Sequence, residues 1–274
     1  MIAKMWWIVA MFCCVTGIQQ QPVVWAQTTV KTASVAQKVI SQGEAIQKFN
    51  QPFDSGSKGD SPTPNGLYGK VIVFDAGHVG VDGGAAGVAG VQEKDINLAV
   101  CQRTAHLLRQ AGAFVVMTRD TDEDLASDAD VRLHRRHHQD LRNRVRLIQE
   151  KNAAAFVSIH CNAIANPTWR GAETLYMKGN FAGERLAKLM QVHFRQDLLP
   201  TRREANEVSN LYILKHIQGP AVLAEIGFIT NPEEGSALRS QTYQQRVAFS
   251  IYTSLVEYFN SPVFEAGGLA TGIE

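Results

Sequence analysis

Two histidines and two glutamates of this chain have the residue types and the spacing of a catalytic metal site. His78 and His160 each stand at the end of a short apolar run, and Glu225 closes the run Ala-Val-Leu-Ala. Such runs predict buried strands, and open α/β sheets form their ligand sites beyond the carboxyl ends of the strands. Glu93 can join the other three, because the loop before it contains five glycines, at positions 80, 83, 84, 87 and 90.

The chemistry that these residues favour is metal-assisted hydrolysis. Two imidazoles and one carboxylate are a ligand set known for catalytic zinc, which keeps a fourth position for water. Glu225, if it lies near the metal without binding it, could take a proton from the water and pass it to the leaving nitrogen. Asn162 would lie on the same side of a continued strand as His160, where its amide could support the ligands.

Each of these residues also has an ordinary explanation. A histidine at a strand end is commonly a hydrogen-bonded structural residue, and a glutamate at a helix start interacts favourably with the helix dipole. Glu225 is harder to explain in this way, because a carboxylate that closes an apolar run is costly to bury without a partner or a cation. The joint arrangement therefore favours a metal site.

An alternation of strand and helix patterns predicts the elements that position these residues. Strands are expected at 70–75, 114–118, 156–160, 173–177, 211–214 and 221–226. Helices are expected at 95–110, 141–152, 181–198 and 241–259. This order predicts a single α/β domain, with a mostly parallel twisted sheet and helices on both of its faces.

The two ends of the chain differ from this domain in composition. Residues 1–26 contain an apolar run and end in Val-Trp-Ala, which suits a signal peptide, with an uncleaved membrane anchor as the alternative. Residues 27–66 are polar and predict a tether, residues 67–260 form the domain, and residues 261–274 are expected to be a flexible tail. Either N-terminal element implies export across the membrane.

The composition excludes some classes of function. The 274 residues carry 27 Lys and Arg against 26 Asp and Glu, so no basic footprint supports a nucleic-acid partner. Cys101 and Cys161 alone would remain after removal of the signal, which is too few for a disulfide framework. An arginine-rich segment at 132–146 is typical of a solvated helix face, with contact to an anionic glycan or a partner protein as the alternative.

The sequence resembles the zinc-dependent N-acetylmuramoyl-L-alanine amidases of the Amidase_3 family. The blocks that carry the resemblance are Phe-Asp-Ala-Gly-His78, Glu93-Lys-Asp95, Thr118-Arg119, Ser-Ile-His160-Cys-Asn162 and Glu225-Ile-Gly-Phe228. The resemblance implies that His78, Glu93 and His160 bind one zinc ion (Zn²⁺) and that Glu225 is the catalytic glutamate. The implied substrate is the amide between muramic acid and L-alanine, and the implied partners are the peptidoglycan glycan strand and its stem peptide.

Further blocks are more similar to a sporulation-specific subgroup of this family than to division amidases. They are Asp82-Gly-Gly-Ala85, Arg144-Val-Arg-Leu-Ile148, Trp169-Arg-Gly-Ala172, Arg203-Glu-Ala205 and Asn210-Leu-Tyr-Ile-Leu-Lys215. The subgroup prepares spore cortex peptidoglycan for muramic-δ-lactam formation and hence for germination. This similarity implies a place in the cell wall or the forespore intermembrane space, and an accessory sporulation or wall protein as a partner. It makes Arg144 a candidate to support the ligands or contact the substrate.

Other functions stay open on the sequence. One is a vegetative cell-wall amidase that acts in cell separation or turnover. Another is a catalytically degenerate protein that binds peptidoglycan, although the complete ligand set argues against it. A zinc peptidase would also fit the ligands taken alone.

Overall fold

The computed structural model of the chain describes residues 66–87, 90–126 and 136–261. The predicted signal peptide or anchor, almost all of the tether and all but the first residue of the tail lie outside these ranges, so they stay predictions. No helix among the described residues combines the length and the apolar character that a membrane span requires.

One six-stranded sheet organises the described residues, with the strand order β2-β1-β3-β6-β4-β5. The strands are β1 (Val71–Ala76), β2 (Phe114–Met117), β3 (Ala155–Asn162), β4 (Glu173–Met177), β5 (Asn206–Val208) and β6 (Ala221–Phe228). β2, β1, β3 and β6 pair in parallel, whereas β4 runs antiparallel to β6, and β5 is parallel to β4. The sheet is therefore mostly parallel, as predicted, with one antiparallel pairing.

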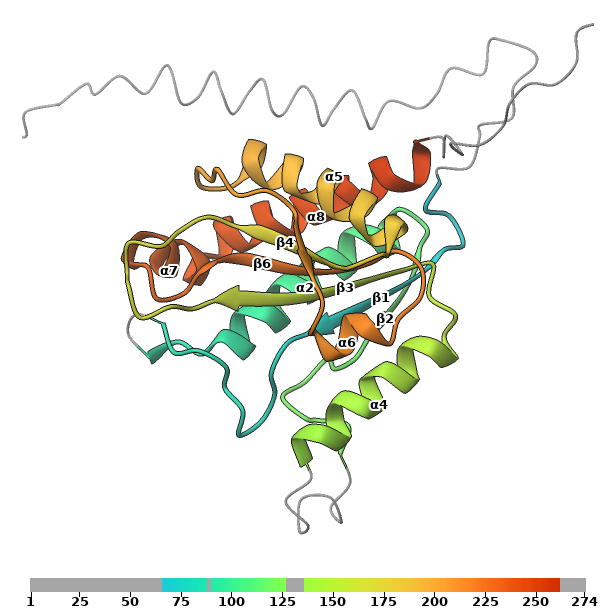
Figure 1. The fold of residues 1–274 in the computed structure, drawn as a ribbon, viewed down its shortest axis with the longest axis horizontal. Helices are drawn as coiled ribbons and strands as arrows, with labels where there is room; N and C mark the ends of the chain where they lie inside the picture. Colours follow the sequence, from blue (N-terminus) through green and yellow to red (C-terminus); the bar gives the residue numbers. More distant parts are fainter. Residues whose placement is uncertain (1–65, 88–89, 127–135, 262–274) are drawn as a thin grey trace, which may run out of the picture. The chain divides into compact units, whose positions relative to one another are not determined.

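Helices cover both faces of this sheet. They are α2 (Glu93–Gln110), α4 (Arg136–Glu150), α5 (Phe181–Asp197), α6 (Tyr212–Lys215), α7 (Pro232–Arg239) and α8 (Gln241–Asn260). Figure 1 shows α5 and α8 on one side of the sheet and α4 and α6 on the other. The prediction of a single α/β domain with two helical layers is thereby confirmed.

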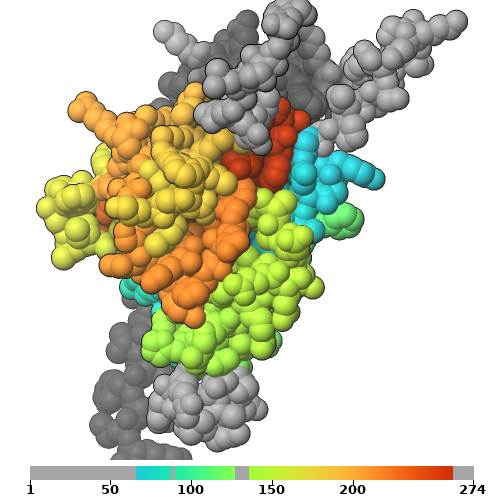
Figure 2. All heavy atoms as spheres, turned by 45° about the vertical axis from the view of Figure 1, so that its right-hand side comes forward, coloured from blue at the N-terminus to red at the C-terminus, as the bar shows by residue number. Residues whose placement is uncertain are grey.

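Alternating side chains of the strands build a separate core on each face. Ile72 and Phe74 of β1 belong to the larger core, which also takes in buried residues of α2, α5 and α8. Val73 points the other way, into a smaller core with Val145 of α4 and Leu214 of α6. Figure 2 shows α4 in green beside the orange segment that contains α6, and together they cover this second face.

Some elements differ from those that the sequence predicts. The run 211–214, predicted as a strand, contains the start of the short helix α6, because a short apolar run does not distinguish a buried strand from a buried helical turn. The described part of α4 begins at Arg136, five residues before the predicted start at 141. β5 and α7 are not predicted at all; β5 has only three residues, Asn-Glu-Val, too few for a strand pattern.

Candidate metal centre

His78, Glu93 and His160 come together at the carboxyl ends of β1 and β3. Each offers one ligand atom, and the three atoms all lie within 4.8 Å of one another. Glu93 Oε1 lies 3.3 Å from His78 Nε2 and 3.1 Å from His160 Nδ1. The structure thus brings together the three residues that the sequence singles out as ligands, although their binding of a metal stays a prediction.

Two glycines leave the room for this convergence. At Gly77, a Cβ atom would lie 2.2 Å from Cε1 of His160. At Gly84, where φ is +66°, it would lie 2.6 Å from Oε2 of Glu93 and 2.7 Å from Cδ2 of His78. Any side chain at either position would push the candidate ligands apart. The glycine-rich loop therefore returns Glu93 to His78, as the sequence predicts.

His78 has an uncommon backbone conformation, and its ring contacts a neighbouring acid. Its φ is +60°, in the left-handed region that non-glycine residues seldom occupy. Its Nδ1 lies 3.0 Å from Asp82 Oδ2, and this contact orients the ring so that Nε2 faces Glu93. Asp82 is not among the predicted site residues; its place four residues after His78 is the one sequence signal that could have indicated this role.

Glu93 is buried and fully hydrogen-bonded. Its Oε1 accepts from Cys161 N at 3.0 Å and from Asn97 Nδ2 at 3.3 Å, and its Oε2 accepts from Ala85 N at 2.9 Å. Burial alone would raise the pKa of Glu93, but the hydrogen bonds with His160 and His78 hold that pKa well below its usual value. Burial also opposes the charge on His78, but its contacts with Glu93 and Asp82 raise the pKa of His78 to about 9.

This electrostatic pattern fits a cation. The ionised carboxylate of Glu93 lies 3.3 Å from His78 Nε2 and 3.1 Å from His160 Nδ1, so a negative charge and two imidazole nitrogens converge. Imidazole nitrogen and carboxylate oxygen are ligands that catalytic divalent metals accept. The three residues could therefore hold a metal ion.

Glu225 lies beside this cluster on the next strand. It pairs in register with His160 across β3 and β6, so its side chain lies on the same face of the sheet as the imidazole. Its Oε2 atom is buried and has no hydrogen-bond partner within the described residues. Burial raises the pKa of Glu225 to about 7. A carboxyl group with this pKa can both take up and release a proton near neutral pH.

Arg144 belongs to a buried ionic network behind the site. Its Nη1 lies 2.8 Å from Asp75 Oδ1, and its Nε lies 2.8 Å from Asp140 Oδ2. The hydroxyl groups of Thr118 and Ser158 also donate to Asp75, at 2.8 and 2.6 Å. Burial opposes the charge on Asp75, but Arg144 and these hydroxyl groups hold its pKa below the usual value.

This network corrects the prediction of a solvated face for the arginine-rich segment. Arg146 fits that prediction, with 69% of its side chain exposed, but Arg144 has only 4% exposed. The negative charge of Asp75 and Asp140 explains why an arginine lies inside. Within the described residues, Arg144 makes no hydrogen bond or ion pair with the three candidate ligands; its Nη1 donates to the Ala76 carbonyl at 3.1 Å, two residues before His78. Residues 132–135 lie outside the described ranges.

Asn162 lies at the end of β3, two residues after His160. His160 pairs with Glu225 and Asn162 pairs with Phe228, so the extra residue of this register shift lies on β6. The backbone carbonyl of Asn162 accepts from Ile229 N at 2.8 Å, but its side chain makes no hydrogen bond within the part of the chain that the structure describes. A supporting role for the Asn162 amide therefore stays a prediction.

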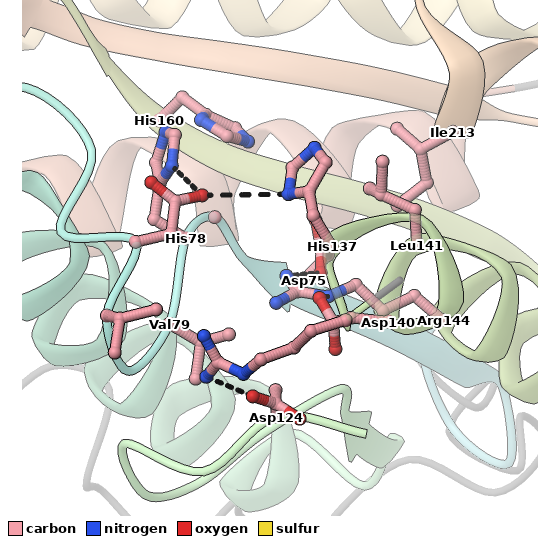
Figure 3. A pocket seen from close by; sticks show the side chains of 14 residues that line it. Asp75, His78, Val79, Asp124, His137, Asp140, Leu141, Arg144, His160 and Ile213 are labelled. Atoms are coloured by element: carbon pink, nitrogen blue, oxygen red, sulfur yellow. Dashed lines mark hydrogen bonds and ion pairs between the residues drawn. The ribbon is translucent and has the colours of Figure 1, made fainter. Parts of the chain in front are cut away.

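A cavity of about 330 Å³ opens beside His78 and His160 and extends toward α4 (Figure 3). Figure 3 shows His137, Leu141 and Ile213 around it, with Asp75 and Arg144 deeper in the protein. Two of the three candidate ligands, His78 and His160, thus line this cavity.

Comparison with known proteins places this site in a family. The model of the family Amidase_3, described as N-acetylmuramoyl-L-alanine amidase, matches residues 72–257. The chain is 40% identical over 193 residues to the germination-specific N-acetylmuramoyl-L-alanine amidase of Bacillus subtilis (strain 168), which covers 70% of this chain and 81% of that relative. It is 31% identical over 197 residues to the N-acetylmuramoyl-L-alanine amidase LytC of the same organism, covering 71% of this chain and 36% of LytC.

A solved structure agrees with these sequence matches. The CwlD amidase from Clostridioides difficile, in complex with the GerS lipoprotein, superposes with a TM-score of 0.67 at 34% identity. The alignment covers 69% of this chain and 98% of that one.

Proposed function

The chain belongs to the Amidase_3 family of N-acetylmuramoyl-L-alanine amidases, and on this premise we propose that it is a zinc-dependent enzyme that cleaves the amide between muramic acid and L-alanine in peptidoglycan. The observation that carries the proposal is the convergence of His78, Glu93 and His160 next to the buried, unpartnered carboxyl oxygen of Glu225. A set of ligands with a separate acid–base group is what metal-assisted amide hydrolysis requires.

The residues of the site have two roles, metal binding and proton transfer. His78, Glu93 and His160 would hold the zinc ion, and Asp82 keeps the ring of His78 turned toward it. When bound, zinc supplies a Lewis acid that polarises the amide carbonyl and lowers the pKa of water. Glu225 takes the proton from the attacking water and delivers it to the nitrogen of the departing L-alanine. The adjacent cavity of about 330 Å³ accommodates the part of the substrate next to the cleaved bond.

A role in the spore cortex is the more specific proposal. It is supported by the 40% identity to a germination-specific amidase, a larger value than the 31% identity to LytC. On this proposal, the enzyme removes stem peptides before muramic-δ-lactam formation, after export to the cell wall or the forespore intermembrane space. The complex of CwlD with a lipoprotein supports an accessory protein as partner.

Digestion of purified sacculi tests the reaction. The full chain should release free stem peptides and expose new alanine amino termini, which mass analysis detects. A chelator should abolish the release, and added zinc should restore it. Binding without cleavage would favour the degenerate peptidoglycan-binding protein, and cleavage within the stem peptide would favour a peptidase. The cortex role has a separate test, because a deletion strain that makes spores with normal δ-lactam content would contradict it.

A further inference from the structure

Arg119 is a buried arginine whose hydrogen bonds, within the described residues, all go to main-chain carbonyl groups. Its Nε donates to Ala76 O at 2.9 Å, and its Nη1 donates to Thr121 O at 3.1 Å. Its Nη2 donates to Gly77 O at 3.2 Å and to Lys94 O at 2.8 Å. It forms no ion pair with an acidic side chain in the described part of the chain. A buried guanidinium that donates only to main-chain carbonyl groups fixes the positions of the backbone segments that carry them.

The segments that Arg119 joins are those that carry two of the candidate ligands. Ala76 and Gly77 directly precede His78, and Lys94 directly follows Glu93. One rigid guanidinium therefore spans the end of β1 and the start of α2. Because its donors point in fixed directions, an arginine can hold two segments at a set distance, which the single ammonium group of lysine cannot do.

Asn97 extends this connection to a ligand atom. Its Nδ2 lies 3.2 Å from Gly77 O, the same carbonyl that accepts from Arg119, and 3.3 Å from Glu93 Oε1. Asn97 is fully buried and stands one helical turn after Glu93. The backbone before His78 and the carboxylate of Glu93 are thus held by one continuous set of contacts.

The backbone at this point needs such support. His78 has a φ of +60°, which is strained for a residue with a side chain. Gly77 packs so closely on the His160 ring that a Cβ atom has no room. A strained and closely packed segment keeps its geometry only when the surrounding contacts determine it.

We propose that Arg119, together with Asn97, is a positioning residue that sets the metal affinity and coordination geometry of the site. It acts by fixing the main chain beside His78 and Glu93 without touching the metal. The inference rests on the proposed function, because it presupposes that the three ligands bind a metal. No contact of Arg119 with substrate is involved.

Metal binding by the full-length protein tests this role. Affinity is measured by competition of Zn²⁺ with a chromophoric chelator, and geometry by the visible absorption of the Co²⁺-loaded protein. We expect Arg119→Lys to weaken metal binding about 10- to 100-fold and to change the Co²⁺ spectrum. Asn97→Ala should change both in the same direction by a smaller factor.

Two controls separate positioning from a general loss of stability. Arg185→Lys alters another arginine that donates to main-chain carbonyls, those of Tyr258 and Ser261 near the end of α8, and it should leave both measurements unchanged. Leu255→Ala removes part of the buried core and leaves Arg119 and Asn97 unchanged, so it should keep the parent affinity while folded. If Arg119→Lys does not fold, Asn97→Ala decides the question.

The outcomes are distinct. A parent protein that binds no metal would overturn the proposed function itself. Folded Arg119→Lys or Asn97→Ala with the affinity and spectrum of the parent would overturn only the positioning role. The same loss of affinity in Leu255→Ala would also overturn it, because stability would then explain the effect.

Discussion

Glu93 and Glu225 are two glutamates at the same edge of one sheet, but their surroundings are opposite. Glu93 accepts three hydrogen bonds from Cys161, Asn97 and Ala85 and faces two imidazoles. Glu225 has a buried oxygen with no partner among the described residues. Accordingly the pKa of Glu93 is well below its usual value, and that of Glu225 is raised by burial to about 7.

This difference teaches how one residue type takes two roles in one site. A carboxylate surrounded by donors stays ionised and suits a permanent ligand. A carboxyl group that burial leaves without partners exchanges its proton near neutral pH and suits acid–base work. The assignment of ligand and base follows from these environments. Substitutions that remove the charge of either glutamate test it.

The largest effect should come from neutralising either glutamate. Glu225→Gln removes the proton acceptor but keeps the shape, so the kcat on sacculi should fall by about 10²- to 10⁴-fold while the metal stays bound. Glu93→Gln should instead lose the metal, because it removes the charged ligand. Metal content by elemental analysis and the rate of peptide release distinguish the two. Equal metal loss in both variants would break the comparison.

Asp75 is a third buried carboxylate, and Arg144 balances its charge. Asp75→Asn leaves the buried Arg144 with one carboxylate fewer, so the free energy of unfolding should fall by about 3–5 kcal/mol. Urea denaturation at pH 7 measures this. Arg146→Gln, which removes an exposed pair with Glu150, should change it by less than about 0.5 kcal/mol. A small effect of Asp75→Asn would mean that satisfied carboxylates here contribute no more than exposed ones.

The smallest effect concerns pH. Glu225 must be ionised to accept a proton, and burial raises its pKa to about 7 in the metal-free protein. A bound cation favours the ionised form and lowers this pKa. The kcat should therefore fall with decreasing pH only below a midpoint that lies under 7, and then by about tenfold per unit once Glu225 is mostly protonated. A pH–rate profile that stays flat down to pH 4 would contradict the proposed base.

The meeting of the three candidate ligands could be predicted, because it follows from simple rules. His78 and His160 end parallel strands, and such ends lie at the same edge of a sheet. The glycines before Glu93 indicate a loop that can turn back. These rules need only the order of residues along the chain.

Other features could not be predicted because they depend on contacts between distant residues. The sequence places Arg144 in a run of charges that predicts a solvated face. Its burial depends on the ion pair with Asp75, which is distant in the sequence. The antiparallel direction of β4 has no signal in its own alternation. The register shift between β3 and β6 after His160 depends on how the two strands pair, and neither strand alone gives a signal for it.

The spread of the ligands along the chain has a consequence for the order of events in folding. Glu93 and His160 are in contact although 67 residues separate them in the sequence. In addition, β1 must pair with β3 before the imidazoles of His78 and His160 can face each other. No short fragment of the chain contains a usable site. On the proposed function, metal binding therefore requires the pairing of β1 with β3, a long-range step, and a chain in which these strands have not paired cannot hold the metal.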